Sequence, residues 1–231
     1  MGSNCSRSRI GGFMRGVSSA ILTAFLEAAE RVESVLDSTV VAEHWEDQSA
    51  LEGYTVAGLA GHLARAVLTA EQYVDAPAPP GTVEATDAAG YLIAVLGDHD
   101  PVDSDFHRRV RARSHDASAV GAAALAQDVG RARRRLQEHL DGSTMDRRVE
   151  VLQGVVLTVE EYLRTRLVEL VVHLDDLAVS VGEENRQDLA QDACEEAAVV
   201  LIQVAMRRHG ALAVIHGLAR RERHPEAVRA F

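Results

Sequence analysis

The chain has 231 residues, of which 47% are hydrophobic and only 4% aromatic, so it can bury a core of mainly small aliphatic side chains. Its 24 basic residues are all arginine, and 35 acidic residues outnumber them, for a net charge of −11. This excess of carboxylates disfavours phosphate backbones, and no apolar run reaches the roughly 18 residues of a membrane span. We therefore expect neither nucleic acid nor a membrane as a partner.

Composition and the start of the chain also indicate the fold class and compartment. With 5 prolines and many alanines, valines and leucines, the sequence favours an all-α fold. Residues 1–16 contain arginines but lack the apolar core of a signal peptide, so we expect a disordered leader there. Cys5 and Cys194 lie in unrelated contexts and predict no disulfide framework. These features are typical of a cytoplasmic protein.

Apolar side chains recur at helical spacing in several stretches, the mark of amphipathic helices. In chain order, helices are expected over residues 17–45, 56–74, 88–96 with Asp87 as the cap, 119–141, 159–181, 189–209 and 211–221. Thr55 is the expected N-cap of the second, and Thr158 with Glu161 forms a capping box before the fifth. Residues 98–101 are expected to be a loop, and 143–157 a connector with room for a short extended segment.

The long helices predict a four-helix bundle of antiparallel helices. We expect this bundle over residues 17–182 and a helical C-terminal extension over residues 183–231. The core of such a bundle is a usual place for a metal site, because side chains from facing helices project into it.

The helix after the capping box carries a stripe of polar residues in an apolar run. Glu169 and His173 lie four residues apart, on one helix face with Cβ atoms about 5–6 Å apart, close enough to bind one metal ion. Burying either group without a partner costs about 2–7 kcal/mol, which favours a bound partner. Tyr162, Arg166 and Asp176 continue the stripe. The other interpretation is a solvated face whose charged groups form ordinary exposed ion pairs.

A further metal ligand has to come from another helix, and His62 is the best candidate. It lies within Val-Ala-Gly-Leu-Ala-Gly-His-Leu-Ala, residues 56–64, whose small side chains let a second helix approach closely. A lone histidine on an apolar face is more often a satisfied core residue, so His62 alone indicates little. Its value depends on the Glu169 and His173 pair.

The two segments together carry a family resemblance. The residues that carry it are Trp45, Ser49-Ala50-Leu51, Gly53-Tyr54-Thr55-Val56, Gly61-His62-Leu63 and the Glu-x3-His run within residues 165–178. They resemble the DinB-like, mycothiol-dependent maleylpyruvate isomerase family. The resemblance implies a four-helix bundle that holds a divalent metal, usually zinc, through His62, Glu169 and His173.

One feature departs from that family. Its isomerases add a C-terminal α/β domain, whereas residues 183–231 are predicted to be helical here. We therefore expect a short member of the family without that domain, and maleylpyruvate itself is not the expected substrate.

The expected site has the chemistry of a catalytic metal centre. Two histidines and a glutamate leave one coordination position open. The resemblance implies that the metal ionises a low-molecular-weight thiol such as mycothiol, which then attacks an electrophilic substrate. Asp176 is expected either to orient the His173 ring or to be solvated. Arg166 is expected to pair with Glu169, ahead of binding an anionic substrate.

Two other functions stay open at this stage. A metal-dependent hydrolase would use the same ligands with metal-bound hydroxide as the nucleophile. A non-catalytic module would bind a metal or a protein partner through the bundle. The sequence also leaves a homodimer open.

Overall fold

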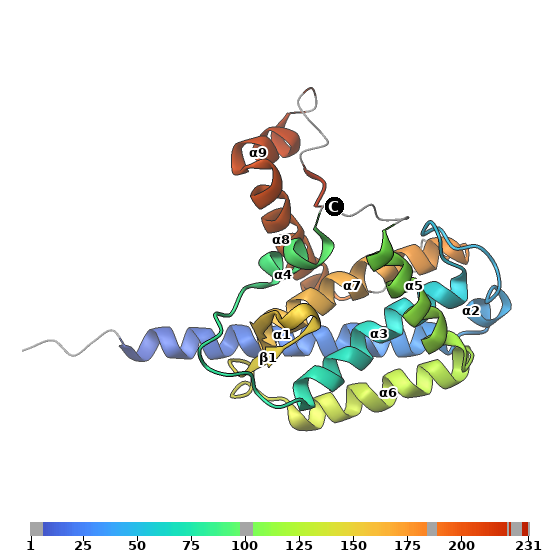
Figure 1. Ribbon diagram of the computed structural model, residues 1–231, viewed down its shortest axis with the longest axis horizontal. Helices are drawn as coiled ribbons and strands as arrows, with labels where there is room; N and C mark the ends of the chain where they lie inside the picture. Colours follow the sequence, from blue (N-terminus) through green and yellow to red (C-terminus); the bar gives the residue numbers. More distant parts are fainter. Residues whose placement is uncertain (1–6, 98–103, 184–188, 221, 223–227, 231) are drawn as a thin grey trace, which may run out of the picture.

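A computed structural model describes residues 7–97, 104–183, 189–220, 222 and 228–230, and these residues are largely helical (Figure 1). The helices are α1 (Arg7–Leu36), α2 (Thr39–Glu43), α3 (Val56–Asp75), α4 (Ala88–Leu96), α5 (Asp105–Ser118), α6 (Ala122–His139), α7 (Val159–Ser180), α8 (Gln191–His209) and α9 (Ala211–Ala219). A short hairpin of β1 (Arg148–Glu150) and β2 (Val156–Thr158) encloses the 3-10 turn η1 (Leu152–Gly154). The prediction of an all-α fold is confirmed.

The bundle is formed by four long helices, α1, α3, α6 and α7. Helix α1 packs against α6 and α7, and α3 packs against the same two helices, so α1 and α3 lie on one diagonal of the bundle. Helix α5 covers the outer side of α3, while α4 and α8 pack on α7. In Figure 1, α8 and α9 project away from the bundle. Within the described residues, no helix combines the length and apolarity of a membrane span.

The bundle core consists of the apolar faces of these helices. Phe25 of α1, Leu63 of α3, Leu125 of α6 and Leu167 of α7 are almost completely buried, and so is Tyr162 of α7. Each of the first four belongs to an apolar stripe at helical spacing, which explains why the long helices could be placed from sequence. This packing fixes the face that α3 and α7 turn toward each other.

The first helix of the structure differs from the predicted one at both ends. Helix α1 begins at Arg7 rather than at residue 17 and ends at Leu36 rather than at residue 45. The Ser38 hydroxyl donates to the Val35 carbonyl at 2.7 Å and accepts from the Val41 N–H at 3.3 Å. One side chain therefore ends α1 and caps α2. Residues 1–6 lie outside the described residues, and the division into leader, bundle and extension stays a prediction.

Helix α5 was not predicted from the sequence. Its segment is rich in arginine and histidine, so the apolar period that marks the other helices is absent. Ser104 provides the N-cap, because its hydroxyl accepts from the His107 N–H. The predicted loop at residues 98–101 lies outside the described residues. Helix α6 occupies most of the range predicted for its helix and follows Gly121, whose φ is 83°.

The start of α7 agrees in part with the predicted capping box. The Thr158 hydroxyl accepts from the Glu161 N–H at 3.2 Å, as expected for an N-cap. Glu161 does not reach back to Thr158, because its Oε2 accepts from the Ala88 N–H at 2.8 Å. The Glu161 side chain, predicted to complete the capping box of α7, therefore holds the first turn of α4 instead.

The C-terminal helices are close to their predicted ranges. Helix α8 is tied to α7 by Arg164, which contacts Glu160 at 2.8 Å and also pairs with Glu196 of α8. Gly210, with a φ of 85°, separates α8 from α9. Cys194 of α8 carries no disulfide, and Cys5 lies outside the described residues.

Candidate metal centre

Helices α3 and α7 bring His62, Glu169 and His173 together. One ligand atom from each residue lies within 4.8 Å of the other two. Glu169 Oε2 lies 3.2 Å from His62 Nε2 and 3.4 Å from His173 Nε2. The exposed fraction of the side chain is 23% for Glu169, 19% for His62 and 15% for His173. The polar stripe of α7 therefore faces α3, and the interpretation as a fully solvated face is wrong.

The ring of His62 is oriented from α5. Its Nδ1 lies 3.3 Å from the hydroxyl of Ser114, a completely buried residue. That hydroxyl donates its hydrogen to the Val110 carbonyl at 2.9 Å, so toward His62 it can only accept. The hydroxyl can therefore accept from Nδ1–H of His62, and Nε2 is the ring nitrogen that faces Glu169.

The ring of His173 is oriented by its own helix. Its Nδ1 lies 2.9 Å from Asp176 Oδ2, one turn further along α7. The carboxylate can only accept, so Nδ1–H donates to it and Nε2 faces Glu169. Both imidazoles thus turn Nε2 toward one carboxylate oxygen, which is the arrangement of two nitrogen donors and one oxygen donor that a divalent cation such as zinc prefers.

The local electrostatics favour a carboxylate at the centre of the cluster. Burial acts to raise the pKa of Glu169, but hydrogen bonds from His173 and His62 hold it well below its usual value. Burial acts to lower the pKa of His173, but Asp176 and Glu169 raise it to about 9. Burial lowers the pKa of His62, despite the hydrogen bond with Glu169. The cluster therefore keeps an ionised carboxylate between the two imidazoles, where a cation would bind.

Arg166 lies beside this cluster against two aromatic rings. Its guanidinium carbon is 5.0 Å from the centre of the Tyr162 ring and 5.9 Å from that of Tyr91. Nε donates to the Thr165 hydroxyl at 3.1 Å, and Nη2 lies 4.0 Å from Glu169 Oε1. Burial acts to lower the pKa of Arg166, but the tyrosines and Glu169 raise it. The contact with Glu169 is the pairing expected from the sequence.

Two parts of the site were missed by sequence reasoning. Ser114 comes from the unpredicted helix α5, and the ring of Tyr54 lies 5.7 Å from that of His62. A Cβ added at Gly61 would lie 2.0 Å from the Ser114 carbonyl oxygen, so glycine is required where α5 crosses α3. The run of small residues around His62 signalled a close helix approach, but not which segment approaches.

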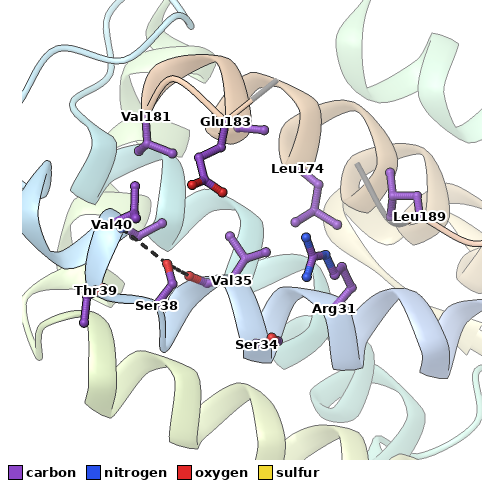
Figure 2. A pocket seen from close by; sticks show the side chains of 12 residues that line it. Arg31, Ser34, Val35, Ser38, Thr39, Val40, Leu174, Val181, Glu183 and Leu189 are labelled. Carbon is purple, nitrogen blue, oxygen red and sulfur yellow. Dashed lines mark hydrogen bonds between the residues drawn. The ribbon is translucent and has the colours of Figure 1, made fainter. Parts of the chain in front are cut away.

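A cavity of about 400 Å³ lies elsewhere, between α1, α2 and the C-terminal part of α7 (Figure 2). Arg31 and Glu183 both project into it in Figure 2. Leu174 and Ala178 of α7 line it, whereas His62, Glu169 and His173 do not. The cavity therefore lies apart from the cluster, which is exposed at the surface over part of each side chain.

The fold and the site define a class: a helical bundle with a candidate centre for a divalent metal between two of its helices. The chain belongs to the mycothiol maleylpyruvate isomerase N-terminal domain family, whose model matches residues 25–178. The match includes all three candidate ligands and confirms the family resemblance. No curated protein and no solved structure matched the chain.

Proposed function

We propose that the protein is a metal-dependent thiol transferase or isomerase. His62, Glu169 and His173 would hold a divalent cation, with zinc the expected ion, and a low-molecular-weight thiol of the mycothiol type would be the co-substrate. Membership of the mycothiol maleylpyruvate isomerase family supports the use of a thiol. The use of an electrophilic substrate stays a prediction, and so does the formation of a homodimer.

The convergence of the two Nε2 atoms on Glu169 Oε2 carries this proposal. Each imidazole has its Nδ1 engaged, His62 with Ser114 and His173 with Asp176, so the ligand atoms are oriented before any cation arrives. Three protein ligands are the number found in catalytic zinc sites, which keep one position for water or substrate.

The chemistry follows from this ligand set. When bound, a divalent cation with an open position lowers the pKa of a thiol enough to supply a thiolate at neutral pH. The chain's own residues hold this centre: Ser114 and Asp176 fix the two rings, and Glu169 contributes the only carboxylate of the cluster. Arg166, pressed against Tyr162, adds a fixed positive charge next to that carboxylate.

Metal analysis of the gently purified protein is the first test. We expect about one divalent ion per chain in the wild type and a loss of most of it in His62→Ala and Glu169→Gln, since two ligands rarely hold zinc. His139→Ala is the matched control, because His139 is an exposed histidine at the end of α6. Wild-type protein without stoichiometric metal would contradict the proposal.

A conjugation assay then tests the thiol. A generic electrophile is offered with and without 2-mercaptoethanol, and we expect turnover only when thiol is present and metal is bound. Turnover without thiol would instead support the hydrolase, which needs the same three ligands but uses hydroxide as nucleophile.

A further inference from the structure

The cavity between α1, α2 and the C-terminal part of α7 takes no part in the candidate metal centre. Its volume of about 400 Å³ lies within the range of about 300–1,000 Å³ that is usual for small-molecule sites. Apolar side chains line both sides of it, Val35 from α1 and Leu174 and Val181 from the α7 side (Figure 2). A cavity of this size with apolar walls fits a short aliphatic molecule.

Local hydrogen bonds hold both walls of this cavity in place. Helix α7 ends in a Schellman motif, in which the Gly182 N–H donates to the Val179 carbonyl at 3.3 Å and the Glu183 N–H donates to the Ala178 carbonyl at 2.8 Å. Gly182 has the positive φ, 71°, that this motif requires. On the opposite wall, the Ser38 hydroxyl joins the end of α1 to the start of α2. The walls are therefore ordered before any ligand binds.

Two side chains of opposite charge enter the cavity. Arg31 of α1 and Glu183 both line it, and both are partly buried, so their charges are screened less than those of exposed groups. Figure 2 shows the guanidinium of Arg31 and the carboxylate of Glu183 at separate places along the cavity, with the Val35 side chain between them in this view. A ligand that contacts both groups therefore needs opposite charges at its two ends and an apolar middle.

We propose that this cavity binds a small linear zwitterion, an aliphatic chain with a carboxylate at one end and an ammonium group at the other. The guanidinium of Arg31 binds the carboxylate, the Glu183 carboxylate accepts from the ammonium group, and the chain lies against Val35 and Leu174. A fatty acid or an alkylamine of the same length contacts only one of the two charged groups and binds more weakly. The site does not depend on the proposed function, because no candidate metal ligand lines the cavity.

Calorimetric titration of the full-length protein with three ligands of equal chain length tests the site. The ligands are 6-aminohexanoate, hexanoate and hexylamine, which carry both charges, the negative one and the positive one. We expect 6-aminohexanoate to bind at least about 10-fold more tightly than either of the others, the effect of one additional charge-assisted hydrogen bond. Equal affinity for all three would indicate an apolar cavity without charge recognition and would overturn the proposal, as would the absence of binding at millimolar concentrations.

Two charge variants then assign the ends of the ligand. Arg31→Gln should weaken 6-aminohexanoate and hexanoate about 10-fold and leave hexylamine unchanged, whereas Glu183→Gln should weaken 6-aminohexanoate and hexylamine and leave hexanoate unchanged. Arg134→Gln and Glu43→Gln are the matched controls, because both residues are exposed and neither lines the cavity. An equal loss for all three ligands in both charge variants would overturn the proposal.

A third variant tests the cavity without changing a charge. Ala178 lines the cavity from α7, so the larger side chain of Ala178→Leu should fill part of it and weaken all three ligands. This keeps the proposal testable if a charge variant does not fold. Unchanged affinities in folded Ala178→Leu would place the ligands elsewhere and overturn the proposal.

The candidate metal centre is the other place where a carboxylate ligand would bind, and Glu169→Gln separates the two sites. Because Glu169 does not line the cavity, this variant should bind 6-aminohexanoate as tightly as the wild type does. Loss of binding in Glu169→Gln, with no effect of Arg31→Gln, would place the ligand at the metal centre and overturn the proposal.

Discussion

Asp176 Oδ2 lies 2.9 Å from His173 Nδ1, and both residues come from α7. The carboxylate accepts the Nδ1–H, so the ring cannot rotate without losing this hydrogen bond, and Nε2 stays directed toward Glu169. Ser114 does the same for His62 with a neutral hydroxyl. The centre thus has one ring held by a charged acceptor and the other by an uncharged one.

This difference leads to a prediction for Asp176→Asn. We expect the divalent ion to bind about 10–100-fold more weakly, because the His173 ring loses the acceptor that orients it and makes it a better donor. Competition with a chelator measures the affinity. Asp175→Asn is the matched control, since Asp175 is the adjacent residue on α7 and is exposed. Equal affinities in the two variants would show that Asp176 is merely solvated.

Ser114→Ala should weaken metal binding by a smaller factor. A neutral acceptor contributes about 0.5–1.5 kcal/mol, so we expect about 2- to 10-fold lower affinity in the same chelator competition. Ser118→Ala is the control, because Ser118 is a buried serine one turn further along α5 whose hydroxyl donates only to the His115 carbonyl. A similar loss in both variants would assign the effect to α5 packing instead.

The crossing of α3 and α5 depends on Gly61. A Cβ there would lie 2.0 Å from the Ser114 carbonyl oxygen, a backbone atom that cannot move without shifting α5. We expect Gly61→Ala to lower the free energy of unfolding by about 1–3 kcal/mol and to weaken metal binding as Ser114 moves. In Gly58→Ala the nearest atom is Tyr54 Cδ1 at 3.3 Å, a side-chain atom that can give way. Urea denaturation of both variants should therefore separate them clearly.

The same crossing shows what could and could not be predicted from the sequence. The ligands on α7 were found because residues four positions apart lie on the same helix face. Helix α3 was placed from its apolar period and its Thr55 cap. The fit of Ser114 against Gly61 joins segments far apart in the chain. No local period encodes that contact, so α5 and its role at His62 appeared only in the structure.

The break between α1 and α2 shows a second limit. An apolar stripe continues through the break, so periodicity predicted one helix where there are two. The Ser38 hydroxyl bonds on both sides of the break and supplies the local signal. Serine also occurs inside helices, and only the observed hydrogen bonds identify it as a cap here.

The attachment of α4 to α8 gives a prediction about pH. Asp87 caps α4 by accepting from the Gly90 N–H at 2.8 Å, and Oδ1 also accepts from Arg207 Nη1 at 2.6 Å. The hydrogen bonds with Arg207 are the largest cause that lowers the pKa of Asp87, and the Gly90 N–H adds to it against the opposing effect of burial. Asp87→Asn keeps the cap and removes the charge, whereas Asp87→Ala removes both.

We expect Asp87→Asn to lower the free energy of unfolding at neutral pH by about 0.2–1 kcal/mol, since both partners of the pair are 43% exposed and screened by solvent. Asp87→Ala should cost about 1 kcal/mol more through the lost cap. Because the folded pKa of Asp87 lies below its unfolded value of about 3.9, the contribution of the pair is complete above that pH and disappears as the pH falls through the folded pKa. Urea titrations above and below this range should therefore show the wild type and Asp87→Asn converging in acid; a difference that persists there would mean that the amide disturbs the cap itself.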